Sequence, residues 1–331
     1  MPKVHSRGVA ADEGGLRLDR WFRRHFPELP HTHLERLLRK GEVRVDGRRA
    51  KAGLRLESGQ TIRIPPLRTV ERPSQEVRPA PSAAEAKALR ARVLYKDADI
   101  LAIDKPAGLA VQGGTKTRHH LDGMLEALRF EKKERPRLVH RLDRETSGVL
   151  VLARTPSAAA WLAAAFREKT AMRKVYWALV RGVPRPPRGE ITAPLAKLAH
   201  GKHERVVASA AEGKVARTRY AVLDQAGQKA AWLALLPLTG RTHQLRVHCA
   251  TLGVPILGDY KYGGSAARIE GAGLAKRLHL HARAIEFPHP KKGKVRILAP
   301  LPEDLLASWA CFGFDPAFKG DPFADFASGV L

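Results

Sequence analysis

The chain has 331 residues, which is long enough for two domains, or for one large and one small domain, around apolar cores. Its 59 lysine and arginine residues outnumber 33 acidic residues and give a formal net charge of +26 at pH 7. Nucleic acid is the first polyanionic partner to expect, because each phosphate that a basic side chain neutralises releases condensed counterions. A basic proteome bias, a solubility charge or a membrane surface would fit the same balance. No apolar run of roughly 18 residues, lipidation signal or signal-peptide core is found, so we expect a cytoplasmic protein and no membrane.

Cysteine and histidine spacing gives no sign of a bound metal. Cys249 and Cys311 are the two cysteines, and neither belongs to a C-x-x-C pair. His279 and His281 share one face of a predicted strand, but no carboxylate or thiol stands at ligand spacing. The glycine pair at residues 113–114 is not followed by a phosphate-binding glycine motif. We expect neither a metal nor an organic cofactor.

Residues 1–66 predict a small α/β domain with a basic surface. Apolar spacing predicts a helix that ends before Pro27 and a second helix that ends at Gly41. The Asp46-Gly47 pair that follows predicts a tight hairpin. The second helix and the hairpin carry these candidate phosphate contacts: Arg36, Arg39, Lys40 and Arg44. A solvated basic face would have the same composition.

Residues 67–90 are rich in proline, serine, alanine and charge, which is typical of a linker. A larger domain is expected over residues 91–314. Its first two predicted strands, at 92–95 and 100–103, are joined by a polar turn. Lys105 follows them as a candidate phosphate contact, although a strand-ending turn explains it equally well.

One acidic residue, Asp143, stands between two arginines directly before the apolar segment 149–153. Arg141 and Arg144 would favour its ionised form, and Thr146-Ser147-Gly148 predicts a turn that holds it at the entrance of a strand. Asp143 is therefore a candidate nucleophile. It could equally be a loop aspartate in a solvated salt bridge.

Further strands are predicted at 173–180, 230–236, 278–282 and 295–298, and helices at 242–252 and 303–311. A tail is expected over 315–331. Strands without regular βαβ alternation favour an α+β fold with a mixed, largely antiparallel sheet flanked by helices and loops. From its residue type alone, Tyr176 on the strand at 173–180 is expected to pack in the core. Arg241 stands directly before the predicted helix at 242–252, and Arg246 lies inside it. Either guanidinium could donate two hydrogen bonds to a carboxylate, or it could be a surface charge.

The string HRLDRETSG at residues 140–148 resembles the signature of the pseudouridine synthases that modify ribosomal RNA, the family typified by RluA, RluC and RluD. Four more strings match this family in order, at residues 104–108, 174–176, 239–248 and 258–263. The resemblance implies that Asp143 is the catalytic carboxylate, that Tyr176 packs on the target base, and that Arg246 lies nearest the carboxylate. Arg241 competes with Arg246 for that role, although its place at a turn suits a phosphate contact. His140, Arg141 and Lys105 are the remaining candidate substrate contacts.

Residues 1–66 resemble the S4 RNA-binding domain and are most similar to the RluC branch. The resemblance implies a pseudouridine synthase fold and isomerisation of a flipped-out uridine in large-subunit (23S) ribosomal RNA, without a cofactor. The expected partner is this RNA or its assembly particle, and the protein is expected to be a monomer. Two alternatives stay open: a non-catalytic RNA-binding ribosome assembly factor, and the same chemistry on other ribosomal sites or on transfer RNA.

Overall fold

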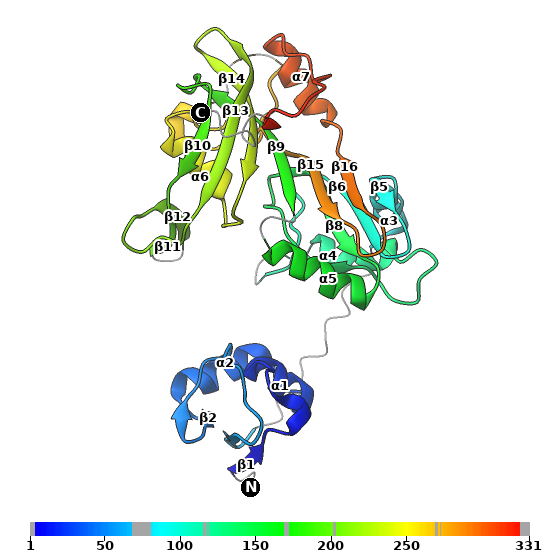
Figure 1. The fold of residues 1–331 in the computed structure, drawn as a ribbon, viewed down its shortest axis with the longest axis vertical. Coiled ribbons are helices and arrows are strands. Elements are labelled where there is room, and N and C mark those ends of the chain that lie inside the picture. The colour runs from blue at the N-terminus through cyan, green and yellow to red at the C-terminus, as the bar shows by residue number, and fades with distance from the viewer. Residues whose placement is uncertain are drawn as a thin grey trace. The chain divides into compact units, whose positions relative to one another are not determined.

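The computed structural model describes residues 4–67, 81–114, 117, 119–168, 172–200, 203–268, 271 and 273–324. The chain divides into two compact units, Met1–Pro79 and Ala80–Leu331 (Figure 1). The division falls within the proline-rich segment that the sequence predicts as a linker. Each unit is described by itself below.

The smaller unit is a four-stranded antiparallel sheet with two helices, and its strands follow the order β1-β4-β2-β3. Its elements are β1 (His5–Gly8), the short 3-10 helix η1 (Ala11–Glu13), α1 (Leu18–His25), α2 (His31–Lys40), β2 (Arg44–Val45), β3 (Arg48–Arg49) and β4 (Thr61–Ile64). Apolar residues of both helices and of β4 form one buried core. Asp46 and Gly47 both have positive φ, at 48° and 74°, as the tight hairpin requires. Both predicted helices and the hairpin are confirmed.

A buried carboxylate, Glu13, ties η1 to α1. It accepts hydrogen bonds from Trp21 Nε1 at 2.8 Å and from the Ala10 amide at 3.1 Å, and it lies 2.5 Å from His25 Nε2. Burial by itself would raise the pKa of Glu13, but these hydrogen bonds and the His25 charge lower it to about 2.

We expect the smaller unit to lose stability in acid because of Glu13. Since folding lowers this pKa, the contribution is fully present above the unfolded value near 4.5 and is lost as the pH falls towards 2. Amide hydrogen exchange of α1, corrected for intrinsic rates at pH 6 and pH 3, measures this loss. In Glu13→Gln the protection should depend less on pH, and an equal dependence in both proteins would contradict the assignment.

The larger unit is built on a ten-stranded mixed sheet. Its main path is β10-β13-β14-β9-β15-β8-β6-β5, with β16 paired to β15 and β7 paired to β8. The β15–β8 pair is parallel and the other strand pairs given for this sheet are antiparallel. The predicted α+β class with a mixed, largely antiparallel sheet is confirmed.

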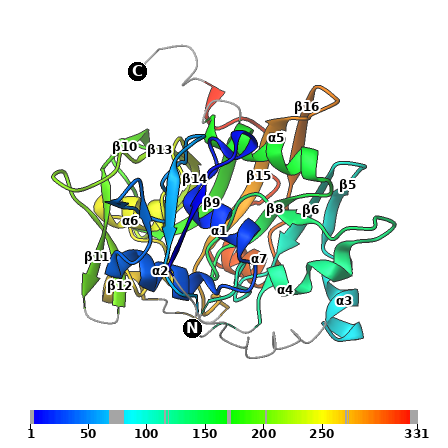
Figure 2. The same ribbon diagram turned by 90° about the horizontal axis from the view of Figure 1, so that it is seen from below.

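The strands of this sheet are β5 (Val93–Lys96), β6 (Ile100–Lys105), β7 (Arg137–Leu138), β8 (Ser147–Ala153), β9 (Arg173–Arg181), β10 (Arg188–Thr192), β13 (Arg217–Ala226), β14 (Ala230–Pro237), β15 (Leu280–Pro288) and β16 (Lys294–Leu298). A separate hairpin consists of β11 (Leu195–His200) and β12 (His203–Ala208). The helices are α3 (Ala83–Arg90), α4 (Leu121–Met124), η2 (Leu125–Leu128), α5 (Pro156–Arg167), α6 (Gln244–Thr251), η3 (Gly264–Ala267) and α7 (Glu303–Cys311). Figures 1 and 2 show α6 on the part of the unit that holds β13 and β14, and α5 on the part that holds β8 and β6.

Strand β9 separates two cores because its side chains alternate between faces. Ala178 and Val180 pack into the core that includes α6 residues, whereas Trp177 and Leu179 pack into the core beside α7. Tyr176 is partly buried and contacts both the α6 core and the core around β6, β8 and α5. The alternation therefore places Tyr176 where two halves of the unit meet.

Two of the predicted segments contain regular structure or buried side chains. The expected linker 67–90 includes α3, whose Leu89 is buried in the larger unit and whose Arg90 donates a hydrogen bond to the Ala127 carbonyl at 2.8 Å. Within the expected tail 315–331, Phe323 is buried in the same core as Trp232, and Asp321 accepts a hydrogen bond from Arg173. Residues 325–331 of that predicted tail lie outside the described residues. Within the described ranges, no helix has both the length and the apolar character needed to cross a membrane.

Candidate active site

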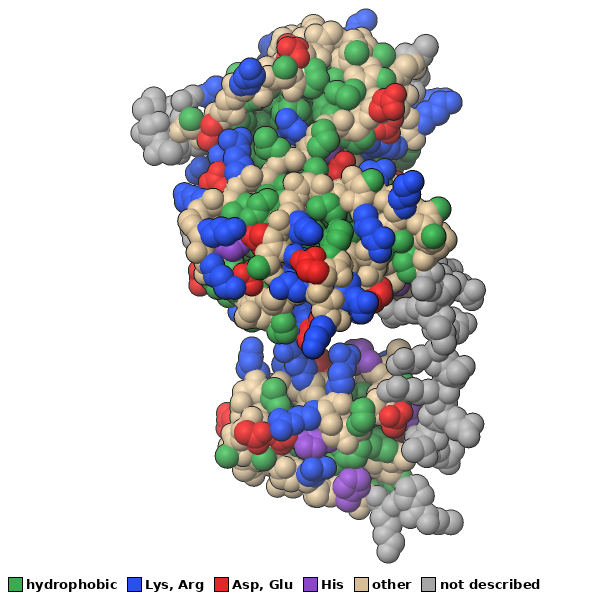
Figure 3. Space-filling view, turned by 90° about the vertical axis from the view of Figure 1, so that its right-hand side faces the viewer, with side chains coloured by type: hydrophobic (Ala, Val, Ile, Leu, Met, Phe, Trp, Pro, Cys, Tyr) green, Lys and Arg blue, Asp and Glu red, His purple; other side chains and the backbone are tan. Residues whose placement is uncertain are grey.

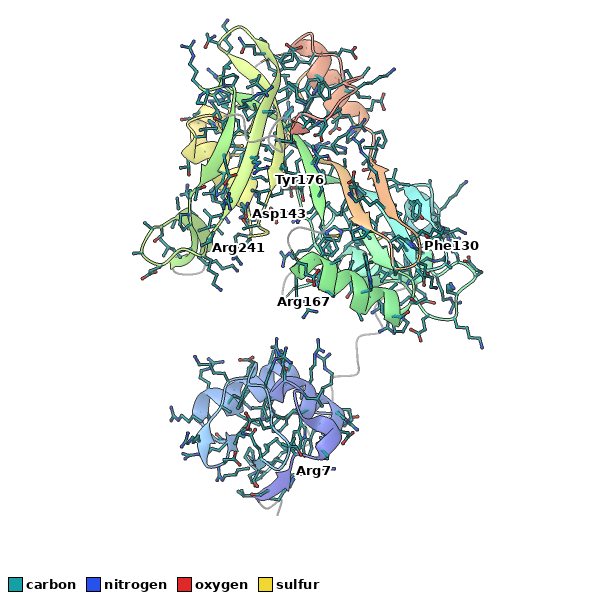
Figure 4. All side chains as sticks on the ribbon, viewed as in Figure 1. Arg7, Phe130, Asp143, Arg167, Tyr176 and Arg241 are labelled. Atoms are coloured by element: carbon teal, nitrogen blue, oxygen red, sulfur yellow. The ribbon has the colours of Figure 1, made fainter. Side chains whose placement is uncertain are left out.

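A cavity of about 310 Å³ opens where the loop before β8, the first half of β9, the end of β14 and the start of α6 come together. Asp143, Tyr176 and Arg241 all line it, and Figure 4 shows them in the same region of the larger unit. The predicted residues His140, Arg141 and Arg246 line the same cavity. Four segments far apart in the sequence are therefore brought together as the resemblance implies.

The Asp143 loop enters β8 through a glycine that the packing requires. Gly148 has φ +113° and pairs with Ala282 of β15 in parallel register. A Cβ at residue 148 would lie 2.3 Å from the Ala282 carbonyl oxygen, so no other residue fits without moving the backbone. Next to it, Ser147 Oγ lies 2.9 Å from His281 Nδ1. The turn TSG thus fixes the end of the loop against β15.

Lys105 is not a phosphate contact, contrary to that candidate role. Its side chain is fully buried, and its ammonium donates hydrogen bonds to the carbonyls of Pro106 at 2.7 Å, Leu109 at 2.9 Å and Arg144 at 3.1 Å. Burial lowers the pKa of Lys105 to about 8, against the opposing effect of Glu145 and Asp143. All three ammonium donors are used, so Lys105 ties the turn after β6 to the residue that follows Asp143.

Arg144 makes the same connection from the other side. Its Nε donates to the Gly108 carbonyl at 2.9 Å, and the Gly108 amide donates to the Arg144 carbonyl at 2.9 Å. Arg144 therefore braces the loop, and its nearest carboxylate is Glu145 at 3.4 Å.

Replacing Lys105 by Met should therefore loosen the Asp143 loop. The variant leaves three carbonyls without their donor, which costs roughly 1–3 kcal/mol of unfolding free energy for each group that stays unsatisfied. We expect the kcat of the reaction that the resemblance implies to fall while the Kd for RNA stays near the wild-type value, since Lys105 is not among the residues that line the cavity. Urea unfolding together with kinetics measures both effects. A selective loss of RNA affinity would instead restore the phosphate role.

His140 also positions the loop. Its Nε2 accepts a hydrogen bond from the Val151 amide at 2.8 Å, and its ring stacks on Phe166 at a centroid distance of 4.5 Å. Burial and the nearby charge of Lys174 lower the pKa of His140 to about 3, so the ring is neutral. His140 still lines the cavity, and its Nε2 is occupied by the Val151 amide. Arg141 is exposed at the cavity and keeps its candidate role.

Arg246 forms the expected pair of hydrogen bonds with a carboxylate, but this carboxylate belongs to Asp259 and not to Asp143. Arg246 is buried and donates from Nε to Asp259 Oδ2 at 2.8 Å and from Nη2 to Asp259 Oδ1 at 2.6 Å. Burial would lower the pKa of Arg246, but the Asp259 hydrogen bonds and charge, with a further contribution from Asp143, raise it. Arg246 thus keeps its positive charge close enough to act on Asp143, while Asp259 holds it in place.

His243 is a neighbour of Asp143 to which the sequence assigned no role. Its Nε2 lies 3.8 Å from Asp143 Oδ2, and its Nδ1 lies 2.5 Å from the Tyr262 hydroxyl. His243 has φ +53°, a backbone conformation that is uncommon for a non-glycine residue. Burial lowers the pKa of His243 despite the opposing charge of Asp143, which favours a neutral ring at neutral pH.

Asp259 and Tyr262 come from one loop, residues 258–263, so this loop supports both groups beside Asp143. Asp259 Oδ1 also accepts the Tyr262 amide at 3.3 Å, and the Arg246 guanidinium lies 5.0 Å from the Tyr262 ring centroid. The string GDYKYG matched the family in sequence, which was the available signal. Its partners could not be predicted because Arg246 and Asp259 stand 13 residues apart on separate elements.

Tyr176 presents its phenol to the cavity from β9. Burial and the negative charge of Asp143 raise the pKa of Tyr176, so the phenol stays neutral. A neutral aromatic ring next to the carboxylate can stack on a base and donate a hydrogen bond.

Arg241 lines the main cavity and two neighbouring cavities of about 340 and 250 Å³. Its Nε donates to the Val215 carbonyl at 3.1 Å, and its amide donates to Gln244 Oε1 at 3.1 Å. The rest of its guanidinium is available at the junction of the three cavities, which suits a phosphate contact better than a grip on Asp143.

In the smaller unit, all four candidate phosphate contacts are exposed: Arg36, Arg39, Lys40 and Arg44. Arg44 partly serves the fold, because its guanidinium donates to the carbonyls of Gly41 at 3.2 Å and Gly47 at 3.1 Å. Figure 3 shows lysine and arginine side chains spread over the visible face of each unit. Among the residues with described positions, no group of three or more His, Cys, Asp or Glu side chains could hold a metal ion.

Comparisons with known proteins identify the family of this chain. Residues 99–251 match the family described as RNA pseudouridylate synthase. The ribosomal large subunit pseudouridine synthase C of Escherichia coli K12 is 42% identical over 311 residues, which cover 92% of this chain and 95% of that protein. The protein of the same name from Vibrio parahaemolyticus is 38% identical, covering 90% and 93%.

Solved structures show the same fold for the larger unit. Human RNA pseudouridylate synthase domain containing 4 is 30% identical with a TM-score of 0.57 and covers 69% of this chain and 95% of that one. Human RNA pseudouridylate synthase domain containing 1 is 31% identical with a TM-score of 0.52, covering 63% and 83%. The chain therefore belongs to the RNA pseudouridylate synthase family, in the branch of its ribosomal members, and is an RNA pseudouridine synthase.

Proposed function

We propose that this enzyme converts specific uridines of large-subunit ribosomal RNA to pseudouridine and that Asp143 starts the reaction. The observation that carries the proposal is the position of Asp143 at a nucleotide-sized cavity, beside the neutral phenol of Tyr176 and the buried cation of Arg246. A volume of about 310 Å³ lies in the range of small-ligand sites and suits one nucleoside. The names of the bacterial relatives support the choice of RNA.

The reaction breaks the bond from uracil N1 to ribose C1′ and joins the base again through C5. Asp143 supplies an anionic oxygen within the cavity, and this oxygen initiates the exchange. Tyr176 stacks on the base and keeps it in the plane of reaction. Arg246, held by Asp259, and His243, held by Tyr262, orient the carboxylate.

The target uridine must leave its stack to reach this cavity, at a cost of a few kcal/mol. Arg141, which is exposed, and Arg241, which is half-buried, bind the flanking phosphates at the cavity and offset part of that cost. We further infer that the smaller unit is an S4-like RNA-binding domain, on the support of its exposed basic residues on α2 and β2. The protein works in the cytoplasm as a monomer on this RNA or its assembly particle.

A substrate comparison tests the proposal. Large-subunit RNA, small-subunit RNA and transfer RNA, each carrying tritium at uracil C5, are incubated separately with the full-length enzyme. Tritium release from large-subunit RNA alone, at a few mapped positions, is the expected result. Release from transfer RNA alone would overturn the substrate assignment. Binding of large-subunit RNA or its particles without any release would favour an assembly factor.

A further inference from the structure

Lys174 lines the catalytic cavity beside the residues already described. It stands two positions before Tyr176 on β9, so both side chains leave the same face of the sheet. At a rise of about 3.4 Å per residue, the two Cα atoms lie roughly 7 Å apart, close to the length of a pyrimidine with its substituents. A base stacked on Tyr176 therefore comes within reach of the Lys174 ammonium.

The Lys174 ammonium has no hydrogen-bond or ion-pair partner among the described residues. Its recorded contact is the ring of Phe166, whose centroid lies 5.8 Å from Nζ. Burial lowers the pKa of Lys174, and its positive charge in turn lowers the pKa of His140. A partly buried cation without a counter-ion is costly unless a ligand supplies the missing negative charge.

The other cations around the cavity are differently engaged. Arg246 is held by Asp259, and Lys105 is buried on three backbone carbonyls. Arg141 is exposed, and Arg241 shares its guanidinium with the Val215 carbonyl where three cavities adjoin. As proposed above, Arg141 and Arg241 bind the backbone phosphates that flank the target. Lys174, next to two aromatic rings and a neutral imidazole, is instead suited to the base.

The proposed reaction places a negative charge on the detached base, and a cation beside the base would stabilise this charge. When C1′–N1 breaks, the electron pair stays on the base, and its negative charge is shared by N1, O2, O4 and C5. This anion must turn next to the Asp143 site without escaping. C1′ is left electron-deficient beside the Asp143 carboxylate. C5 then gives an electron pair of the anion to C1′ to form the new bond, the C5 proton passes to a base, and N1 takes up a proton, so atoms and charge balance. A fixed ammonium at a carbonyl oxygen stabilises the detached anion where water would otherwise compete.

We infer that Lys174 binds a carbonyl oxygen of the detached uracil, stabilises its negative charge and retains it until the new bond forms. The inference rests on the proposed function, because it assigns a residue to the step in which the base is free. It predicts a side reaction that a purely structural lysine would not produce. Without Lys174, part of the cleaved base should leave the enzyme as free uracil and leave an abasic site in the RNA.

The test compares Lys174→Met, Lys174→Arg and the matched control Lys294→Met, which removes one exposed charge on β16. Pseudouridine, free uracil and aniline-sensitive strand breaks are measured from the same labelled RNA, with Kd and thermal unfolding alongside. For Lys174→Met we expect kcat to fall by about 10²–10³-fold, as for loss of one charge-stabilising donor. Its Kd should stay within about twofold of wild type, and free uracil should appear. Lys174→Arg should release little free uracil, because the guanidinium keeps a positive charge near the base. Lys294→Met should resemble wild type in all of these measurements.

Each other outcome is decisive. Wild-type kcat in Lys174→Met with weaker, less salt-dependent RNA binding would make Lys174 a phosphate contact and overturn the inference alone. A lower kcat without free uracil, with lowered unfolding temperature, would make it structural. If Lys174→Met unfolds, the ratio of free uracil to pseudouridine is measured in Lys174→Arg instead. A much lower kcat with no increase in free uracil would contradict the proposal that Lys174 retains the base. No pseudouridine from wild type would overturn the proposed function itself.

Discussion

Asp143→Asn is expected to lower the rate of pseudouridine formation by about 10⁴–10⁶-fold, the scale on which loss of a catalytic nucleophile acts. The amide has nearly the volume of the carboxylate but no anionic oxygen to start the exchange. The Kd for RNA should remain within about twofold of wild type, because the basic residues at the cavity stay in place. Tritium release from uracil C5 measures the rate, and filter binding measures the affinity.

Glu145→Gln provides the matched control for this prediction. Glu145 is two residues away on the same loop, and its carboxylate pairs with exposed Arg144 at 3.4 Å. Loss of this charge should change the rate by less than about fivefold, as for a surface pair worth at most about 1 kcal/mol. Equal loss of rate, RNA affinity and unfolding free energy in Asp143→Asn would instead mean that Asp143 holds the fold.

Arg246→Met should damage both stability and activity. It leaves the buried carboxylate of Asp259 without its two hydrogen bonds, at a cost of about 3–5 kcal/mol of unfolding free energy. It also removes the cation that acts on Asp143 and leaves a second negative charge nearby. The double variant Arg246→Met with Asp259→Asn should recover stability because no unpaired charge remains. It should not recover activity.

The pair of Arg277 and Asp304 is the control for burial. It has the same two-point geometry, at 2.5 and 2.9 Å, but the Asp304 side chain is 47% exposed. Arg277→Met should therefore cost about 1 kcal/mol or less. Urea unfolding of the three variants gives the comparison. A double variant as unstable as Arg246→Met would show that the guanidinium stabilises the fold by packing rather than by charge.

The sequence predicts those features of the site that depend on residues close together in the chain. Asp143 stands before an apolar strand, Tyr176 lies on a strand with clear alternation, and α6 ends where Gly253 takes φ +80°. These features depend on neighbouring residues in the chain, and the family resemblance supplied the roles.

The partners of buried polar groups could not be predicted in this way. A lysine in a turn looks the same in sequence whether its ammonium faces RNA or three carbonyls, as that of Lys105 does. Likewise, nothing local indicates that Arg246 chooses Asp259 or that His243 takes a left-handed conformation beside Asp143. Each depends on how distant elements pack, as does the burial of Phe323 in a segment without periodicity.

The most direct test of the account is nucleoside analysis of large-subunit RNA after incubation with wild type and with Asp143→Asn. The account predicts one pseudouridine for each tritium lost from C5 with wild type, and none with the variant at matched RNA occupancy. Pseudouridine formed equally by both proteins would contradict the role of Asp143. Its absence with wild type, on RNA and on precursor particles alike, would contradict the proposed function.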